Sequence, residues 1–339
     1  MSGIVTVYVG LDYHQDAVQV CVLGKDGGVL TNRCVANDEQ AIRAVPERYG
    51  QHVVAAIEAC CGAAELAERL SRSAGWSISL AHPGFVNRMK QNPDKSDFTD
   101  AQLLADLVRI GYLPKVWLAP AELRRLRRLV RYRQQLVDQR KTTKLRMRAL
   151  LRENRLKPPP HVNAWTQAFF AWLETAELHD EDRWLMDQHL GQLQELKQQI
   201  LQVNARLRSR LEDDAITQRL LSYYGVGLIT AATMRAEIGR FDRFRSGKQL
   251  AKFCGISPRN ASSGARQADA GLVKSGNPQL RRVLIELAQR LLWRGEGPHA
   301  QMAYRLLQKG KPKNVVVAAV ANRWIRWMYH QMQPQSLAA

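Results

Sequence analysis

The sequence predicts an α/β domain with a mixed sheet in its N-terminal part, followed by a mainly helical region. Three observations support this fold class. Apolar residues alternate with polar ones over about the first 35 residues, helix-like and strand-like segments then alternate up to residue 81, and helical spacing dominates beyond residue 120. With 339 residues, the chain is long enough for two or three domains with cores of their own.

The first strands are indicated by alternating apolar residues. Val5, Val7 and Val9 lead to Asp12, and a second alternating run, 18–23, precedes the glycine-rich turn 24–28, a pattern typical of a β-hairpin. Three antiparallel strands followed by helix-strand alternation favour a sheet of the ribonuclease-H type. The later elements expected are a strand at 29–35, a helix at 38–49, a buried strand at 53–57 that ends at Glu58, a helix at 63–74, and a strand at 77–81 closed by a His-Pro-Gly turn.

Four carboxylates stand at the ends of these elements, where functional side chains converge. Asp12 and Glu58 each follow a strand, and Asp97 and Asp100 share one face at the start of the next helix. Four acids at one edge would repel one another unless a cation lay between them, and oxygen ligands favour Mg²⁺. Asp94 is predicted to be the helix N-cap. The alternative is that all these acids are capping or turn residues, which the helix macrodipole stabilises.

The net charge of the chain is +19, with an isoelectric point near 10.1, which predicts a polyanionic partner. Nucleic acid is the first choice. An anionic membrane surface is the weaker alternative, because no basic amphipathic terminus or lipidation signal accompanies the charge. A mean hydropathy of −0.34 without a long apolar run argues against a membrane span. Since strand-like residues follow the first methionine at once, we expect a cytoplasmic protein that joins the nucleoid when it acts.

Five cysteines are too few and too irregularly spaced for a disulfide framework or a CxxC zinc site. We therefore expect them to be reduced and mostly buried.

A long basic helix is predicted over 124–157, where fourteen Lys and Arg residues face only two acids and apolar residues recur at helical spacing. A solvated face normally mixes both signs, so the excess favours contact with a phosphate backbone. The eleven arginines among them favour bidentate phosphate contacts and stacking on unpaired bases. The predicted contacts are Arg124, Arg125, Arg127, Arg128, Arg131, Arg133, Arg140, Lys141, Lys144, Arg146 and Arg148.

Three consecutive prolines, 158–160, are expected to end this helix and the first domain, 1–157. A helical spacer is predicted over 158–213. Its aromatic residues between 165 and 184 are interpreted as packing core, and its apolar residues at 193, 196, 200, 203 and 207 form a coiled-coil seam of about two heptads. Such a seam is too short to be stable alone and is expected to serve oligomerisation or domain spacing.

The third predicted domain, 214–339, is mainly helical, with Trp324, Trp327 and Met328 in its core. Gly225 and Gly227 lie between two apolar helices, as in a helix-hairpin-helix whose backbone N–H groups face a phosphate, although glycine turns between helices are common. Two loops rich in Gly, Ser, Arg and Lys are expected to face a polyanion through Arg259, Arg266 and Lys274. By composition alone, the Ser-Ser-Gly at 262–264 is an ordinary turn.

Several stretches together resemble a known family in order and spacing. IEAC at 57–60, HPGFV at 82–86, KSDFTDA at 95–101, LADL at 104–107 and LP at 113–114 are similar to the N-terminal domain of the DEDD insertion-sequence transposases. GVG at 225–227, GISP at 255–258, SSG at 262–264 and KSGNP at 274–278 are similar to the C-terminal domain of that family. The resemblance covers nearly the whole chain. Cys60-Cys61 departs from the Thr-Gly that often follows Glu-Ala there, which alters the packing beside Glu58 but keeps the acid.

The resemblance implies a RuvC-like domain that carries Asp12, Glu58, Asp97 and Asp100 with Mg²⁺, then a helical spacer and a domain with a catalytic serine. By position this serine is Ser263, with Ser262 as the neighbouring alternative. Members of the family are recombinases guided by a bridge RNA, a structured non-coding RNA that pairs with double-stranded donor and target DNA. The implied assembly is a homo-oligomer, with dimers joining into a tetramer and a site that is composite between protomers.

Two alternatives stay open at the level of the sequence. In a metal-dependent nuclease or junction resolvase, the four acids would activate water and Ser263 would be structural. In a non-enzymatic architectural protein, the acids would be helix caps and the basic residues alone would bind nucleic acid.

Overall fold

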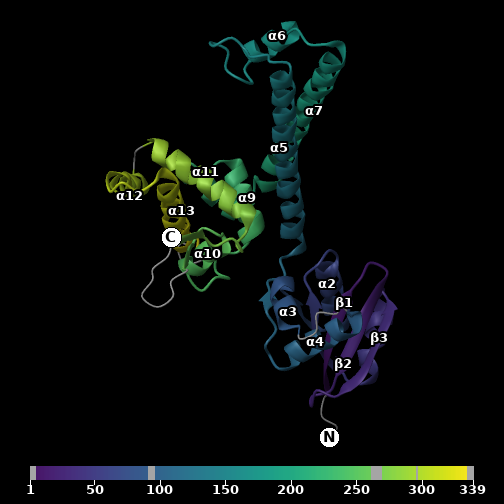
Figure 1. Cartoon of the computed structure of the whole chain (residues 1–339). Helices are drawn as coiled ribbons and strands as arrows, with labels where there is room; N and C mark the ends of the chain where they lie inside the picture. Colours follow the sequence, from purple (N-terminus) through teal and green to yellow (C-terminus); the bar gives the residue numbers. More distant parts are fainter. Residues whose placement is uncertain (1–4, 91–95, 261–268, 295–296, 334–339) are drawn as a thin grey trace. The chain divides into compact units, whose positions relative to one another are not determined.

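The computed structural model describes residues 5–90, 96–260, 269–294 and 297–333 (Figure 1). The chain divides into an N-terminal unit, 1–121, and a C-terminal unit, 122–339. The three-domain division at residues 157 and 213 stays a prediction. Within the described ranges, no helix combines the length and the apolar character that a membrane crossing requires.

The N-terminal unit is built on a six-stranded mixed sheet with strand order β3-β2-β1-β4-β5-β6. β1, β2 and β3 are antiparallel, β1, β4 and β5 are parallel, and β6 runs antiparallel to β5. This arrangement is compatible with the predicted ribonuclease-H-type fold. The short β6 was not predicted, because two residues are too few to show alternation. The strands are β1 (Thr6–Tyr13), β2 (Ala17–Leu23), β3 (Val29–Ala36), β4 (His52–Glu58), β5 (Ser77–Ala81) and β6 (Lys115–Val116).

Helices cover both faces of this sheet. On one face, α1 (Glu39–Arg43) and α2 (Ala63–Ala74) pack on the inward-facing valines and leucines of β1 and β2. On the other, α3 (Pro83–Met89) and α4 (Asp97–Arg109) share a hydrophobic cluster with Ala56 of β4 and Ala81 of β5, and α4 also packs on β1 and β2. The two faces follow from the alternation along each strand, since successive side chains point to opposite sides of the sheet.

Gly10 allows α4 to lie directly against β1. A Cβ atom added at Gly10 would lie 1.8 Å from the carbonyl oxygen of Ala101 and 2.6 Å from the amide nitrogen of Ala105. Only a residue without a side chain fits this contact. Because α4 begins with Asp97, the close approach also sets the distance between this aspartate and the end of β1.

Several local predictions for this unit were wrong. The helix expected at 38–49 is α1 followed by a 3₁₀ turn, η1 (Pro46–Arg48), because Pro46 has no N–H to continue the helix. The expected His-Pro-Gly turn instead begins α3, with Pro83 at the first helical position. Ser96 occupies the N-cap position of α4, whereas Asp94 lies outside the described residues. Three of the five cysteines are exposed.

The C-terminal unit is mainly helical. Its last six helices share one core, and α5, α6 and α7 share a second. The small sheet of β7 (Pro258–Asn260) and β8 (Asp269–Leu272) is antiparallel. The helices are α5 (Ala121–Glu153), α6 (Gln167–Thr175), α7 (Asp180–Leu211), α8 (Ala215–Leu221), α9 (Leu228–Ile238), α10 (Gly247–Phe253), α11 (Pro278–Arg294), α12 (Gly297–Gln308) and α13 (Lys313–Gln331).

The long helices α5 and α7 lie side by side and run in opposite directions (Figure 1). Thr143 of α5 donates a hydrogen bond of 2.9 Å to Gln192, and Arg133, ten residues earlier, donates one of 2.6 Å to Asn204. All five apolar residues of the predicted seam are buried within the chain itself, so they are not a free face for a second copy. They are Leu193, Leu196, Ile200, Val203 and Leu207.

The basic helix ends differently from the prediction. α5 stops at Glu153, before the three prolines, and Arg155 adopts a left-handed conformation with φ of 54°. The Leu156 N–H then donates to the Leu151 carbonyl over 2.8 Å. This pattern of a left-handed residue and a backward hydrogen bond closes the helix locally.

The aromatic cluster is packing core, as predicted, except at one position. Phe169 is buried, and Trp165, Phe170 and Trp172 pack around it. Trp184, in contrast, is 61% exposed. Near the C-terminus, Trp324 and Met328 are buried as predicted, whereas Trp327 is 37% exposed and lies over Tyr223.

Candidate active site

Two of the predicted acids are neighbours where β1 and β4 end. These strands are parallel, and Leu11 is paired with Ile57. Asp12 and Glu58, the next residues of each strand, therefore stand side by side at the carboxyl edge of the sheet. Asp97 is the first residue of α4, the helix that packs closely on Gly10, and it lies at the same end of the sheet.

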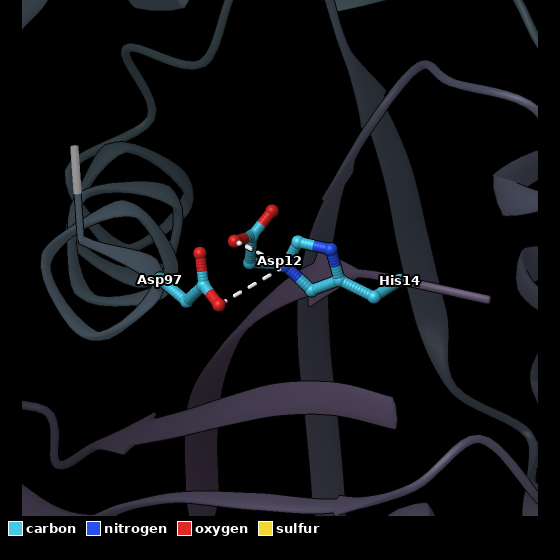
Figure 2. A group of neighbouring side chains, drawn as sticks. All are labelled: Asp12, His14 and Asp97. Atoms are coloured by element: carbon cyan, nitrogen blue, oxygen red, sulfur yellow. Dashed lines mark ion pairs between the residues drawn. The ribbon is translucent and has the colours of Figure 1, made fainter. Parts of the chain in front are cut away.

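Asp12, His14 and Asp97 point toward one another, as Figure 2 shows. His14 Nε2 lies 3.4 Å from Asp12 Oδ2 and 3.2 Å from Asp97 Oδ2. One ligand atom from each residue lies within 4.8 Å of the others. His14 was not among the predicted site residues. Its spacing of two from Asp12 was the available signal, because alternate residues at the end of a strand face the same side.

Burial raises the pKa of Asp12, and the carboxylates of Asp97 and Asp100 raise it further, while His14 lowers it. Asp12 Oδ2 is buried without a hydrogen-bond partner among the described residues, since the contact with His14 is only a long ion pair. A buried carboxylate oxygen whose contact is a long ion pair, close to a second carboxylate, is an arrangement that a divalent cation satisfies. The donor set therefore fits a metal ion.

The fourth acid, Asp100, is engaged by a lysine. Lys90 Nζ lies 2.6 Å from Asp100 Oδ2, and Asp100 is only 9% exposed. Lys90 directly follows α3, and the segment between the two residues includes 91–95, outside the described ranges. Nothing in the sequence pattern indicated this pair, because the two residues belong to different elements.

The four predicted acids thus have three different environments. Asp12 and Asp97 meet at His14, and Asp100 pairs with Lys90. Glu58 is half-buried beside Asp12, and both acids contribute to the raised pKa of the Cys60 thiol, for which burial is the main cause.

The predicted serines Ser262 and Ser263, together with Arg266, lie outside the described residues. Arg259 in β7 and Lys274 after β8 are both exposed and flank this segment.

Part of the predicted nucleic-acid surface is used inside the chain. Arg131 donates two hydrogen bonds to the carboxylate of Glu237, and Arg127 donates one of 2.7 Å to the Ala236 carbonyl. Both acceptors belong to α9, so these two arginines join α5 to the C-terminal core.

Other arginines and lysines of α5 have different neighbours. Lys144 and Arg148 lie over the ring of Trp165, at 4.5 and 5.5 Å from its centroid. Arg125 pairs with Glu122. Arg128 and Arg146 are exposed, and Arg124 is half-buried.

A groove between α5, α7, α9 and α11 collects six basic side chains against two acids, Asp138 and Glu286. We call it the basic groove, and its volume is about 720 Å³. The first turn of α9, from Gly227 to Thr230, also lines it. Three of its basic residues were predicted contacts, and the three others come from α7 and α11. The six are Arg133, Arg140, Lys141, Arg208, Arg282 and Arg290.

The predicted glycine hairpin joins α8 to α9. Gly225 has a positive φ of 80°, and a Cβ there would lie 2.9 Å from Leu287. Gly227 occupies the N-cap position of α9, with open space where a side chain would be. The start of α9 therefore faces the basic groove.

Two family models match the chain. Residues 9–155 match a DEDD model of the IS110 type, described as transposase, and residues 217–305 match the transposase IS116/IS110/IS902 family. Together the two segments span more than half of the chain, and the first contains all four predicted acids.

Curated relatives of the chain carry the same description. A probable family 20 transposase of Pseudomonas aeruginosa is 29% identical over 95% of both chains. The transposase for insertion sequence element IS1328 of Yersinia enterocolitica is 27% identical over 94% of both chains. The transposase for IS1111A of Coxiella burnetii is 26% identical, over 84% of this chain and 77% of its own.

Proposed function

Because this chain belongs to the IS110-type DEDD insertion-sequence transposases, DNA strand-transfer enzymes of mobile elements, we propose that it cuts and rejoins DNA through a covalent phosphoserine bond. A bridge RNA encoded by the element selects the double-stranded donor and target. One observation carries the catalytic part of this proposal. Asp12 and Asp97 lie close together, and Oδ2 of Asp12 is buried without a hydrogen-bond partner among the described residues.

The proposed cation is Mg²⁺, held at the edge of the sheet by carboxylates from the group Asp12, Glu58, Asp97 and Asp100. A bound cation there supplies positive charge that lowers the pKa of an attacking hydroxyl and stabilises the charge of the phosphate. The role of the fold is to hold these carboxylates before substrate arrives: Asp12 and Glu58 by the register of two parallel strands, Asp97 by the first turn of α4.

Ser263 is the proposed nucleophile, with Ser262 as the alternative. Its Oγ forms a bond to phosphorus as the bond from phosphorus to one deoxyribose oxygen breaks. The serine proton passes to a carboxylate acting as general base, and the departing oxygen takes up a proton. A deoxyribose hydroxyl of another strand then attacks the phosphoserine and restores the serine. The number of phosphate ester bonds is conserved, so rejoining needs no ATP.

We propose that the exposed face of α5 and the basic groove contact nucleic-acid phosphates. The groove combines net positive charge with the N–H groups of the first turn of α9, and both favour an anion. Arg127 and Arg131, which are bonded to α9, are then primarily structural. The assembly into dimers and a tetramer stays a prediction, and the seam of α7, buried within the chain, does not support it.

The test for the nucleophile is a covalent adduct. Purified protein is incubated with donor and target DNA, copurified RNA and Mg²⁺, and separated on a denaturing gel. We expect an adduct with the native protein and with Ser262→Ala, and none with Ser263→Ala. An adduct that persists in Ser263→Ala and disappears in Ser262→Ala moves the role to Ser262. Cleavage without any adduct supports the nuclease alternative, in which water attacks.

The test for the guide is the identity of the copurified nucleic acid. We expect sequencing to find one defined RNA, encoded beside the transposase gene. Random fragments of cellular RNA and DNA would contradict guidance while leaving the strand chemistry open to the adduct test.

A further inference from the structure

Two nitrogen-bearing side chains stand among the acids, and the four-acid pattern includes neither. His14 lies between Asp12 and Asp97, and Lys90 lies on Asp100. Each changes what the neighbouring carboxylates can hold.

We propose that the protein without nucleic acid binds one divalent cation through Asp12, His14 and Asp97, with His14 as a nitrogen ligand that favours Mn²⁺ over Mg²⁺. Lys90 keeps Asp100 out of this ligand set. This inference takes from the proposed function only that the site binds a divalent cation. Its test uses neither DNA nor strand exchange.

The spacing of the three donors supports the first part. Ligands at about 2.1 Å from an octahedral ion lie about 3 Å from their neighbours. His14 Nε2 is 3.2 Å from Asp97 Oδ2 and 3.4 Å from Asp12 Oδ2. Small side-chain rotations therefore suffice to bring all three atoms onto one ion. His14 and Asp97 are about half exposed, which leaves room for water ligands.

The nitrogen ligand sets the preference among metals. Mg²⁺ prefers oxygen ligands, whereas imidazole suits first-row transition metals. A site in which His14 Nε2 replaces one carboxylate oxygen therefore binds Mg²⁺ more weakly relative to Mn²⁺. The Asp12 oxygen is buried without a hydrogen bond, so either ion would supply the partner that this oxygen lacks.

Lys90 supplies the charge that a second cation would bring. Its ammonium group lies 2.6 Å from Asp100 Oδ2, and the pair is largely buried. Moving Asp100 onto a metal ion would separate two largely buried charges, and breaking such a pair is strongly unfavourable. The Lys90 ammonium thus balances the charge of Asp100, and Asp12, His14 and Asp97 together bind a single ion.

The first experiment measures Mn²⁺ bound to the purified full chain without nucleic acid. Electron paramagnetic resonance of free Mn²⁺ should give one bound ion per chain, and pulsed measurements should detect coupling to an imidazole nitrogen. In His14→Ala the nitrogen coupling should disappear, the Mn²⁺ dissociation constant should rise about tenfold or more, and the preference over Mg²⁺ should fall. His52→Ala is the matched control, because this exposed histidine begins β4 and so lies at the end of the strands away from Asp12 and Glu58.

Three results would overturn the assignment of His14: no bound Mn²⁺, bound Mn²⁺ without nitrogen coupling in the native protein, or a coupling that survives in His14→Ala. The native spectrum needs no variant, so a misfolded His14→Ala cannot hide the answer. A recombination assay that fails while the nitrogen coupling is present counts against the proposed function alone.

The second experiment replaces the lysine. Lys90→Met should release Asp100 and raise the number of bound Mn²⁺ ions from one to two per chain. Lys25→Met, in the exposed turn after β2, removes the same charge and should leave one ion. A native protein that already binds two ions, or a folded Lys90→Met that still binds one with unchanged affinity, would overturn the role of Lys90.

Discussion

The guanidinium of Arg131 in α5 forms two parallel hydrogen bonds, of 2.8 and 3.0 Å, with the carboxylate of Glu237 in α9. Glu237 is only 2% exposed, and Asn277 donates a further hydrogen bond of 2.8 Å to it. One of the arginines that the charge pattern assigns to nucleic acid therefore fastens the basic helix to the C-terminal core.

We expect Glu237→Gln to destabilise the protein by about 2 kcal/mol. Breaking a fully buried ion pair costs about 3–5 kcal/mol, and the value here is lower because half of the Arg131 side chain is exposed. Urea unfolding at pH 7 measures the change. Arg128→Gln removes an exposed charge from the same helix and should shift the free energy of unfolding by no more than about 0.5 kcal/mol. Equal effects of the two substitutions would show that the buried pair has no special role.

Gly10→Ala should force α4 away from β1, since the new methyl group would lie 1.8 Å from the Ala101 carbonyl oxygen. We expect a loss of stability of about 3 kcal/mol or more, the upper range for overpacked cores. Because α4 carries Asp97, binding of Mn²⁺ should weaken in any protein that remains folded. Thermal unfolding and Mn²⁺ titration check both effects. Gly75→Ala is the control: Gly75 has a positive φ but open space around it, so that variant should lose stability and keep its Mn²⁺ affinity.

Asp214 caps α8 and binds Arg235, and its pKa reflects both roles. Burial raises this pKa, but hydrogen bonds from Arg235 and Thr217 outweigh burial and hold it below its ordinary value. Ionised Asp214 therefore stabilises the fold above about pH 3.8, and this contribution is lost as the pH falls through the lower pKa of the folded state.

We expect Asp214→Asn to cost about 1–2 kcal/mol at pH 7, because asparagine keeps the cap but loses the charge-assisted bonds to Arg235. The difference between variant and native protein should shrink toward zero below the native pKa. Urea unfolding as a function of pH measures it, and a difference that stays constant down to pH 2 would contradict the assignment.

Lys141 lines the basic groove on its α5 side. If it contacts a phosphate, Lys141→Ala should weaken binding to all nucleic-acid sequences about equally and reduce the slope of log affinity against log salt by about 1. Fluorescence anisotropy at several salt concentrations measures the slope. Lys25→Ala changes the net charge equally in the other unit and should leave the slope unchanged. A slope that responds equally to both substitutions would exclude a local contact.

Much of the N-terminal fold could be predicted, because its signals are local. Alternation along 18–23 and a continuous apolar run at 53–57 identified strands that are present as β2 and β4, and the expected helix at 63–74 is α2. The helix at 38–49 failed because Pro46 interrupts a pattern that is otherwise helical. Three antiparallel strands followed by helix-strand alternation leave few sheet topologies, and the observed strand order is among them.

The amino-acid sequence by itself determined the first five strands, the position of Asp12 and Glu58 at strand ends, and the excess positive charge of α5, because each depends on neighbours within a few residues. Only the tertiary structure decided which groups meet. In the tertiary structure, His14 lies next to Asp97 and Lys90 lies next to Asp100. Arg131 is hydrogen-bonded to Glu237, and the seam of α7 is buried within the chain. These pairs depend on how closely elements far apart in the sequence approach one another. Gly10, for example, allows α4 to lie directly against β1. Periodicity along the chain carries no information about such distances.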